Sequence, residues 1–192
     1  LLIFDAGTGI KALSDHLMAT EHARVDAKIF ISHPHWDHIN ALPYFAPLYT
    51  RGNSVEILGP CQDHKCVENF IKEQMDGVYF PITAQDFGAR VTYHNLREES
   101  FQIDQMSVRT MLLNHPGHCL GYRVDYAKRS ICYITDNEIY PGDSGLREEG
   151  YVRKLTKFVA GADALIMDST YTDEEYLRHV NWGHSPLSEV VS

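Results

Sequence analysis

The stretch Ile31-Ser-His-Pro-His-Trp-Asp-His-Ile-Asn40 places four good metal ligands close together in the chain. Residues 27–31 form a short apolar run rich in β-branched side chains, which predicts a buried strand. Downstream, apolar residues recur at helical spacing but are interrupted by two prolines, which predicts a short or kinked helix. The ligands therefore lie on a strand-to-helix loop, where an α/β sheet usually carries its chemistry. They are His33, His35, Asp37 and His38.

The spacing of these ligands favours two metal ions over one. His33 and His35 are two residues apart, so in extended backbone their side chains point the same way and can share an ion. Asp37 and His38 follow after the chain turns, which directs them to a different point. Imidazole and carboxylate groups together suit zinc, with manganese or iron as alternatives. A histidine-rich surface loop is the competing interpretation, and four ligands directly behind a buried strand disfavour it.

Length and composition indicate a single soluble domain. The chain has 192 residues and 44% apolar content, enough for a substantial core. Its formal net charge is −9, from 17 basic and 26 acidic side chains. Because nucleic acid prefers basic surfaces, this charge argues against nucleic acid as a partner and for a small-molecule substrate. No apolar run approaches the roughly 20 residues of a membrane helix.

Cysteine use and the chain ends add two expectations. Cys61, Cys66, Cys119 and Cys132 form no C-x-x-C pair, so neither a zinc ribbon nor a disulfide scaffold is predicted. We expect reduced thiols in a cytoplasmic protein. The sequence starts inside an apparent strand and stops early in an apparent helix, so we expect residues 1–192 to be one domain clipped at both ends.

Further candidate ligands follow later strands. In the segment Asn114-His-Pro-Gly-His-Cys-Leu-Gly-Tyr-Arg123, His115 and His118 compete for one ligand position. Asp136 follows an apolar run at 130–135, and a carboxylate at a strand end can bridge two cations. His184 precedes a predicted C-terminal helix.

The H-x-H-x-D-H pattern resembles the signature of the metallo-β-lactamase fold superfamily. Ile57-Leu-Gly-Pro60, Gly121-Tyr-Arg123 and Thr135-Asp-Asn137 are similar to its ribonuclease Z and small phosphodiesterase branch. The resemblance, together with alternating strands and helices, predicts an α+β fold. This fold is a four-layer αββα sandwich with two mixed β-sheets face to face and helices on the outside.

The resemblance also implies a dinuclear ligand set. The third histidine of the first site is His115 by ribonuclease Z-like spacing and His118 by glyoxalase II-like spacing; the Gly-Tyr-Arg ending favours His115. His118 is then a support, a proton carrier or a structural residue. Asp5 would support the metal loop from behind, and Asp168 could orient a ligand. One ion takes His33, His35 and His115, the other takes Asp37, His38 and His184, and Asp136 bridges them.

The implied activity is hydrolysis by a water held between two divalent ions, with zinc favoured. We expect a phosphodiesterase for small, including cyclic, phosphodiesters, with Asp37, Asp136 and His118 as candidate catalytic residues. Arg123 is a candidate for pairing with phosphate. Met167 stands where ribonuclease Z-like proteins have a proton-transferring histidine, which weakens a ribonuclease assignment. The alternatives are a thioester or lactone hydrolase and a non-catalytic metal-sensing module of a larger protein.

Overall fold

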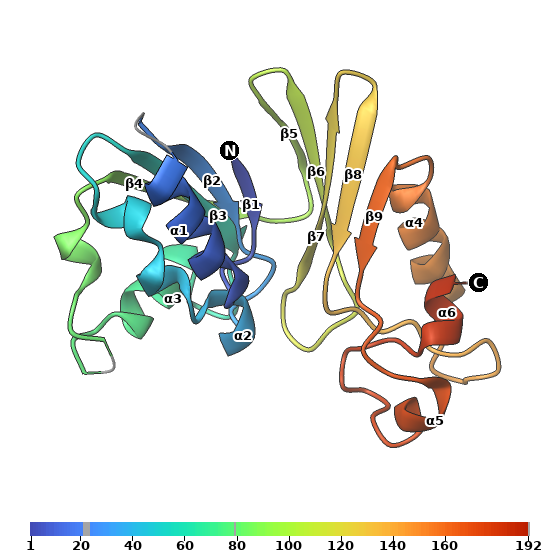
Figure 1. Ribbon diagram of the computed structural model, residues 1–192. Coiled ribbons are helices and arrows are strands. Elements are labelled where there is room, and N and C mark those ends of the chain that lie inside the picture. Colours follow the sequence, from blue (N-terminus) through green and yellow to red (C-terminus); the bar gives the residue numbers. More distant parts are fainter. Residues whose placement is uncertain (21–23, 79, 192) are drawn as a thin grey trace. The chain divides into compact units, whose positions relative to one another are not determined.

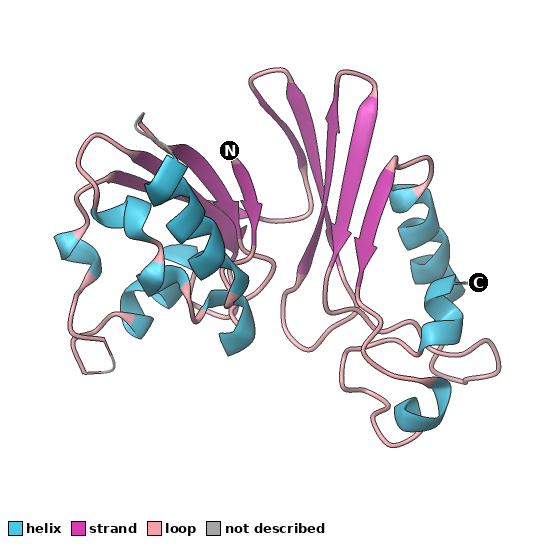
Figure 2. Cartoon of the chain, in the orientation of Figure 1, coloured by secondary structure: helices cyan, strands magenta, loops and turns pink. Residues whose placement is uncertain are grey.

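The computed structural model describes residues 1–20, 24–78 and 80–191. The chain divides into two compact units, Leu1–Leu96 and Arg97–Ser192, each built on its own sheet. Figures 1 and 2 show helices accompanying both sheets. Within the described residues, no helix combines the length and apolar character that crossing a bilayer requires.

Unit 1 contains a four-stranded sheet in sequential order. All of its described strand pairs are parallel, so this sheet is not mixed as the sequence predicted. Its core joins Ile10 of α1 and Ile71 of α3 to Ile29 and Ile57 of the sheet. The strands are β1 (Leu2–Phe4), β2 (Asp26–Phe30), β3 (Ser54–Pro60) and β4 (Arg90–Leu96). The helices are α1 (Gly9–Thr20), α2 (Trp36–Ile39) and α3 (Val67–Gln74), with 3₁₀ turns η1 (Leu42–Tyr44), η2 (Ala46–Tyr49) and η3 (Ala84–Asp86).

Unit 2 contains a five-stranded mixed sheet in the order β5-β6-β7-β8-β9. The first four strands pair antiparallel and β9 pairs parallel to β8. Helix α4 connects these two and packs Leu155 against Cys132 and Ile134 of β8. The strands are β5 (Ser100–Ile103), β6 (Met106–Leu112), β7 (Leu120–Tyr126), β8 (Arg129–Ile134) and β9 (Ala164–Met167). The helices are α4 (Glu149–Val159), α5 (Asp173–Tyr176) and α6 (Leu187–Val191), and α4 lies alongside β9 in Figure 1.

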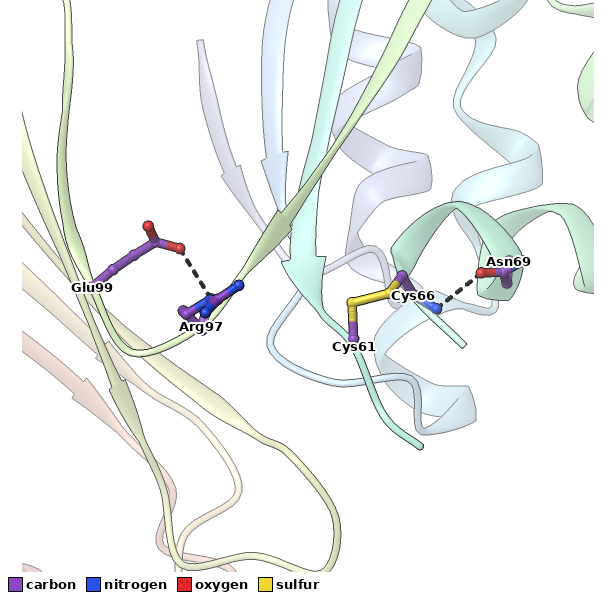
Figure 3. The surroundings of a disulfide bond; sticks show 5 residues. All are labelled: Cys61, Cys66, Asn69, Arg97 and Glu99. Carbon is purple, nitrogen blue, oxygen red and sulfur yellow. Dashed lines mark hydrogen bonds between the residues drawn. A yellow bond between two sulfur atoms is a disulfide. The ribbon is translucent and has the colours of Figure 1, made fainter. Parts of the chain in front are cut away.

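The segment between β3 and α3 corrects the expectation of reduced cysteines. Cys61 and Cys66 form a disulfide, shown in Figure 3. Gln62 and Lys65 pair across the turn that the disulfide closes, and helix α3 begins directly after this turn, at Val67. The prediction failed because it considered only cysteine spacing typical of zinc sites. Cys119 and Cys132 are buried thiols, as expected.

Candidate metal centre

The loop between β2 and α2 brings the four predicted ligands of unit 1 together. The ring centroids of His33 and His35 are 4.4 Å apart, and those of His33 and His38 are 4.3 Å apart. An Asp37 carboxylate oxygen lies 3.2 Å from Nε2 of His38. His33 and His38 are buried, whereas His35 and Asp37 are exposed. The predicted ligands of this unit therefore form one cluster that is enclosed by protein on one side and exposed to solvent on the other.

Asp5 holds this loop from behind, which confirms its predicted supporting position. Its carboxylate accepts hydrogen bonds from the Ser32 backbone N–H at 2.7 Å and the Ser32 hydroxyl at 2.8 Å. It also contacts Nδ1 of His38 at 2.8 Å. Because a carboxylate only accepts, Nδ1 of His38 carries the proton and Nε2 presents a lone pair. The Ser32 hydroxyl proton points to Asp5, so its oxygen accepts from Nδ1 of His33 at 3.0 Å, which leaves His33 in the same tautomer.

The turn after β1 fits tightly under the metal loop. The Ala6 N–H donates to the His38 carbonyl at 2.7 Å. A Cβ atom at Gly7 would lie 2.3 Å from the Asp37 carbonyl oxygen, so only glycine permits this approach. The glycine-containing turn at residues 5–9 is therefore a support for the ligand loop.

Unit 2 contains a second cluster around Asp136. Nε2 of His115 lies 3.7 Å, and Nε2 of His184 lies 3.9 Å, from the same Asp136 carboxylate oxygen. Asp168 contacts Nδ1 of His184 at 2.6 Å, which confirms that it is placed to orient this ring. Asp136, Asp168 and His184 offer ligand atoms within 4.8 Å of one another. This unit therefore collects its three predicted ligands from separate segments: His115 follows β6, Asp136 follows β8 and His184 lies between α5 and α6.

The backbone around Gly183 orients His115. Nδ1 of His115 donates to the Gly183 carbonyl at 3.1 Å, so Nε2 is the atom that can bind a metal. Gly183 has a φ of +85°, and a Cβ there would lie 2.1 Å from Nδ1 of His115. His118 is exposed and belongs to none of the ligand groups formed by described residues. This arrangement favours His115 as the ligand, and that choice stays a prediction.

The sequence predicted Glu138 to be either a support for the ligands or a solvated residue, and the structure shows a buried support. It is 2% exposed, and its carboxylate accepts from the Tyr176 hydroxyl at 2.7 Å, the Asn181 N–H at 2.8 Å and the Gly183 N–H at 2.9 Å. Its own backbone N–H donates to the Asn114 carbonyl at 2.8 Å. Burial, together with Glu138, raises the pKa of Tyr176, so the phenol remains a donor. Glu138 thus joins the segments that carry all three ligands of unit 2.

Arg123 does not occupy the predicted phosphate-binding position. It is buried, and its guanidinium donates to the carbonyls of Phe158 at 2.9 Å and Ala160 at 2.8 Å. It also pairs with Asp125 at 3.1 Å. These carbonyls end α4, where a cation stabilises the helix terminus. Arg123 is therefore a buried helix cap.

The donor groups fit divalent metal ions in both units. In four of the candidate histidines Nδ1 is held by a neighbouring oxygen, so Nε2 is the nitrogen that would coordinate an ion. These are His33, His38, His115 and His184. Such contacts are typical of metal-binding histidines. Imidazole nitrogens combined with carboxylates match zinc, manganese or iron.

A histidine with no other candidate ligand beside it in the sequence is expected on the surface, and His16, His64 and His94 lie there. The same expectation for His22 falls outside the described residues. His179 is half-buried rather than exposed, because its ring stacks on Tyr171.

Comparison with known proteins adds a sequence relationship to ribonucleases. The chain is 30% identical over 149 residues to a protein named Ribonuclease Z from Prochlorococcus marinus subsp. pastoris, covering 73% of this chain and 46% of the relative. A protein named Ribonuclease Z from Streptococcus gordonii is 30% identical, with coverages of 64% and 39%. The chain thus spans about half the length, or less, of these curated relatives.

Solved structures with the same fold extend over nearly the whole chain. The human tRNase Z short form matches with a TM-score of 0.65 and 25% identity, covering 99% of this chain and 74% of that one. A diphosphatase of the PhnP family matches with a TM-score of 0.65 and 18% identity, covering 99% and 62%. These matches confirm the predicted metallo-β-lactamase fold.

The relatives overturn one expectation. The acidic net charge argued against nucleic acid as a partner, yet both curated relatives are named Ribonuclease Z and one structural match is a tRNase Z, so that expectation is wrong. Net charge describes the whole surface, whereas bound cations can reverse the charge of a site. A family model described as a beta-lactamase superfamily domain matches residues 2–192, and with that match this chain belongs to the β-lactamase superfamily.

Proposed function

We propose that this chain is a divalent-metal-dependent phosphodiesterase whose substrates include RNA as well as small, including cyclic, phosphodiesters. The observation that carries the proposal is the pair of carboxylate–histidine contacts, Asp5 with His38 and Asp168 with His184. Each fixes a ring with Nε2 presented for coordination. The sequence similarity to ribonucleases supports a phosphodiester as the substrate bond.

We further propose that ligands from both units hold two ions, zinc by preference. The proposal rests on the superfamily resemblance and on the donor set that each unit assembles separately. Seven side chains are too many for one tetrahedral zinc ion. The set is His33, His35 and His115 for one ion, Asp37, His38 and His184 for the other, and Asp136 shared between them.

When bound, the ions supply the positive charge that activates a water and stabilises negative charge developing on a phosphoryl oxygen. The residues of the chain have complementary tasks. Asp5 and Asp168 fix the tautomers of their histidines, so the rings need no reorientation during the reaction. Asp37 and Asp136 supply negative charge that retains the cations. His118 is exposed, and in this proposal its imidazole nitrogen donates a proton to the leaving oxygen.

A substrate screen with zinc, manganese and iron loaded separately tests the function. We expect hydrolysis of bis-p-nitrophenyl phosphate and of a short RNA, with little turnover of thioesters and lactones. Asp136→Ala should abolish most activity, whereas the exposed control His16→Ala should retain it. Turnover of thioesters or lactones alone would replace the proposal with acyl hydrolysis. Metal binding without any turnover would indicate the sensing module.

Cytoplasmic location also stays a prediction. The buried thiols Cys119 and Cys132 accord with a reducing compartment, whereas the Cys61–Cys66 disulfide accords with an oxidising one. Thiol labelling of the protein in intact cells would decide between them.

A further inference from the structure

Residues 171–184 present an exposed aromatic surface beside the candidate ligand His184. We propose that this surface binds an unpaired nucleobase of the substrate, next to the phosphodiester that is cleaved. The inference rests on the proposed phosphodiesterase function and names its substrate class. The segment begins just after β9 and includes α5, in the orange-to-red part of Figure 1.

Four rings form a continuous row in unit 2. Tyr171 and His179 stack with ring centroids 4.4 Å apart and planes inclined by 7°. Trp182 meets His179 edge-on at 4.8 Å, and Tyr171 meets His184 edge-on at 5.9 Å. We call Trp182, His179, Tyr171 and His184 the aromatic row. It leads from solvent to the candidate metal ligand.

The outer end of the aromatic row is open to a ligand. Trp182 is 61% exposed, although its indole is among the most apolar surfaces that a protein can present. An exposed aromatic ring beside a candidate active site is typical of a binding surface. Its broad flat face suits another planar ring, and stacking of a base on such a ring tolerates any base identity.

The aromatic row is also held in place before any ligand arrives. Nδ1 of His179 donates to the Glu175 carbonyl at 2.7 Å, and the backbone N–H of Trp182 donates to the His179 carbonyl at 3.1 Å. The neighbouring Asn181 N–H is bound to buried Glu138 at 2.8 Å. Because the backbone is anchored on both sides, little ordering is needed when a base binds.

Charge on this segment favours a single nucleotide over a duplex. Arg178 makes no side-chain hydrogen bond or ion pair with any other residue that the structure describes, so its guanidinium can pair with one phosphate. Asp173 and Glu174 are exposed on the same segment and would repel a surface carrying many phosphates. An unstacked base with one neighbouring phosphate matches both features, as in the recognition of single-stranded RNA.

Fluorescence of metal-loaded protein tests the base-binding surface directly. The chain has two tryptophans, so Trp36→Phe leaves Trp182 as the single indole reporter. The probes are an adenosine dinucleotide with a phosphorothioate linkage and its abasic counterpart with the same linkage. We expect the dinucleotide to quench Trp182 and to bind about tenfold more tightly than the abasic probe. Equal binding of the two probes would overturn the inference. Tighter binding of decanoate, an aliphatic anion without a base, than of the dinucleotide would overturn it as well.

Calorimetric titration of variants that retain Trp36 separates base stacking from other effects of changing an exposed side chain. Trp182→Ala should lose the roughly tenfold preference for the base, and Trp182→Phe should restore most of it. Leu177→Ala is the matched control, since Leu177 is 77% exposed on the same segment. An equal loss in the Leu177 variant would overturn the inference.

The outcome is independent of the proposed activity. Base-dependent quenching in a protein that hydrolyses no phosphodiester would support the base-binding surface and contradict the proposed phosphodiesterase activity. Hydrolysis of bis-p-nitrophenyl phosphate combined with base-independent binding would contradict the base-binding surface and leave the proposed activity standing.

Discussion

Glu138→Gln should release the segment that carries Gly183 and His184. The Glu138 carboxylate receives three hydrogen bonds, at 2.7–2.9 Å, from Tyr176, Asn181 and Gly183. All three partners are donors. Glutamine keeps the shape but replaces one acceptor oxygen with an amino group, which then faces a donor. It also removes the negative charge from a site that is 2% exposed.

The size of the effect follows from this geometry. A hydrogen bond to a charged group contributes about 1.5–3 kcal/mol, and the substitution loses at least one while weakening the others. We therefore expect the free energy of unfolding to fall by about 3–5 kcal/mol, because a lost hydrogen bond to a charged group and a buried donor left unpaired both contribute. Because the Gly183 carbonyl holds His115, metal affinity should fall by about 10–100-fold.

Urea unfolding measures the stability, and titration with Co²⁺ followed by visible absorption measures the metal site. Tyr176→Phe removes one of the three donors and should cost about 1–2 kcal/mol. Glu148→Gln is the matched control because Glu148 is exposed in the same unit. If Glu138→Gln and Glu148→Gln unfold at the same urea concentration and bind Co²⁺ equally, the clamping role of Glu138 is refuted.

Three further predictions concern the same candidate centre. Gly183→Ala should displace His115 and weaken zinc binding by more than tenfold, because the new Cβ would lie 2.1 Å from Nδ1 of that ring; unchanged zinc titrations would contradict this. His115→Ala should lose metal and activity together, whereas His118→Ala should keep metal by elemental analysis and slow turnover by about 10²–10⁴-fold; metal loss in the His118 variant alone would reverse the assignment. Asp5→Asn should reduce metal affinity by about 10–100-fold, since an amide can no longer fix the His38 tautomer reliably; equal zinc binding in dialysis would show that Asp5 serves folding only.

The local elements were largely predictable. The apolar run at 27–31 and the alternation at 106–112 predicted strands that the structure contains as β2 and β6. Leu13 and Leu17 at helical spacing predict a helix that the structure contains as α1. Helix α4 was missed, although Tyr151, Val152 and Leu155 recur at helical spacing and face the core. That periodicity was a usable signal.

Several features depended on contacts that local patterns cannot encode. Arg123 was expected near phosphate, but its guanidinium caps α4 more than thirty residues away in the sequence. The Cys61–Cys66 disulfide closes the turn directly before α3, and cysteine spacing alone did not predict this bond. Net charge argued wrongly against nucleic acid as a partner. It averages over the whole surface and does not report the local arrangement of candidate ligands.

The candidate ligand chemistry was predictable from the sequence, because His33, His35, Asp37 and His38 are neighbours in the chain and backbone geometry relates their side chains directly. How the candidate ligands are held depends on contacts that form only when the chain folds. Glu138 contacts Gly183 across 45 residues, and the Gly183 carbonyl contacts His115 across 68. Neither contact has a periodic or local signature. Such supports arise when folding buries polar groups and each must find a partner, wherever that partner lies in the sequence.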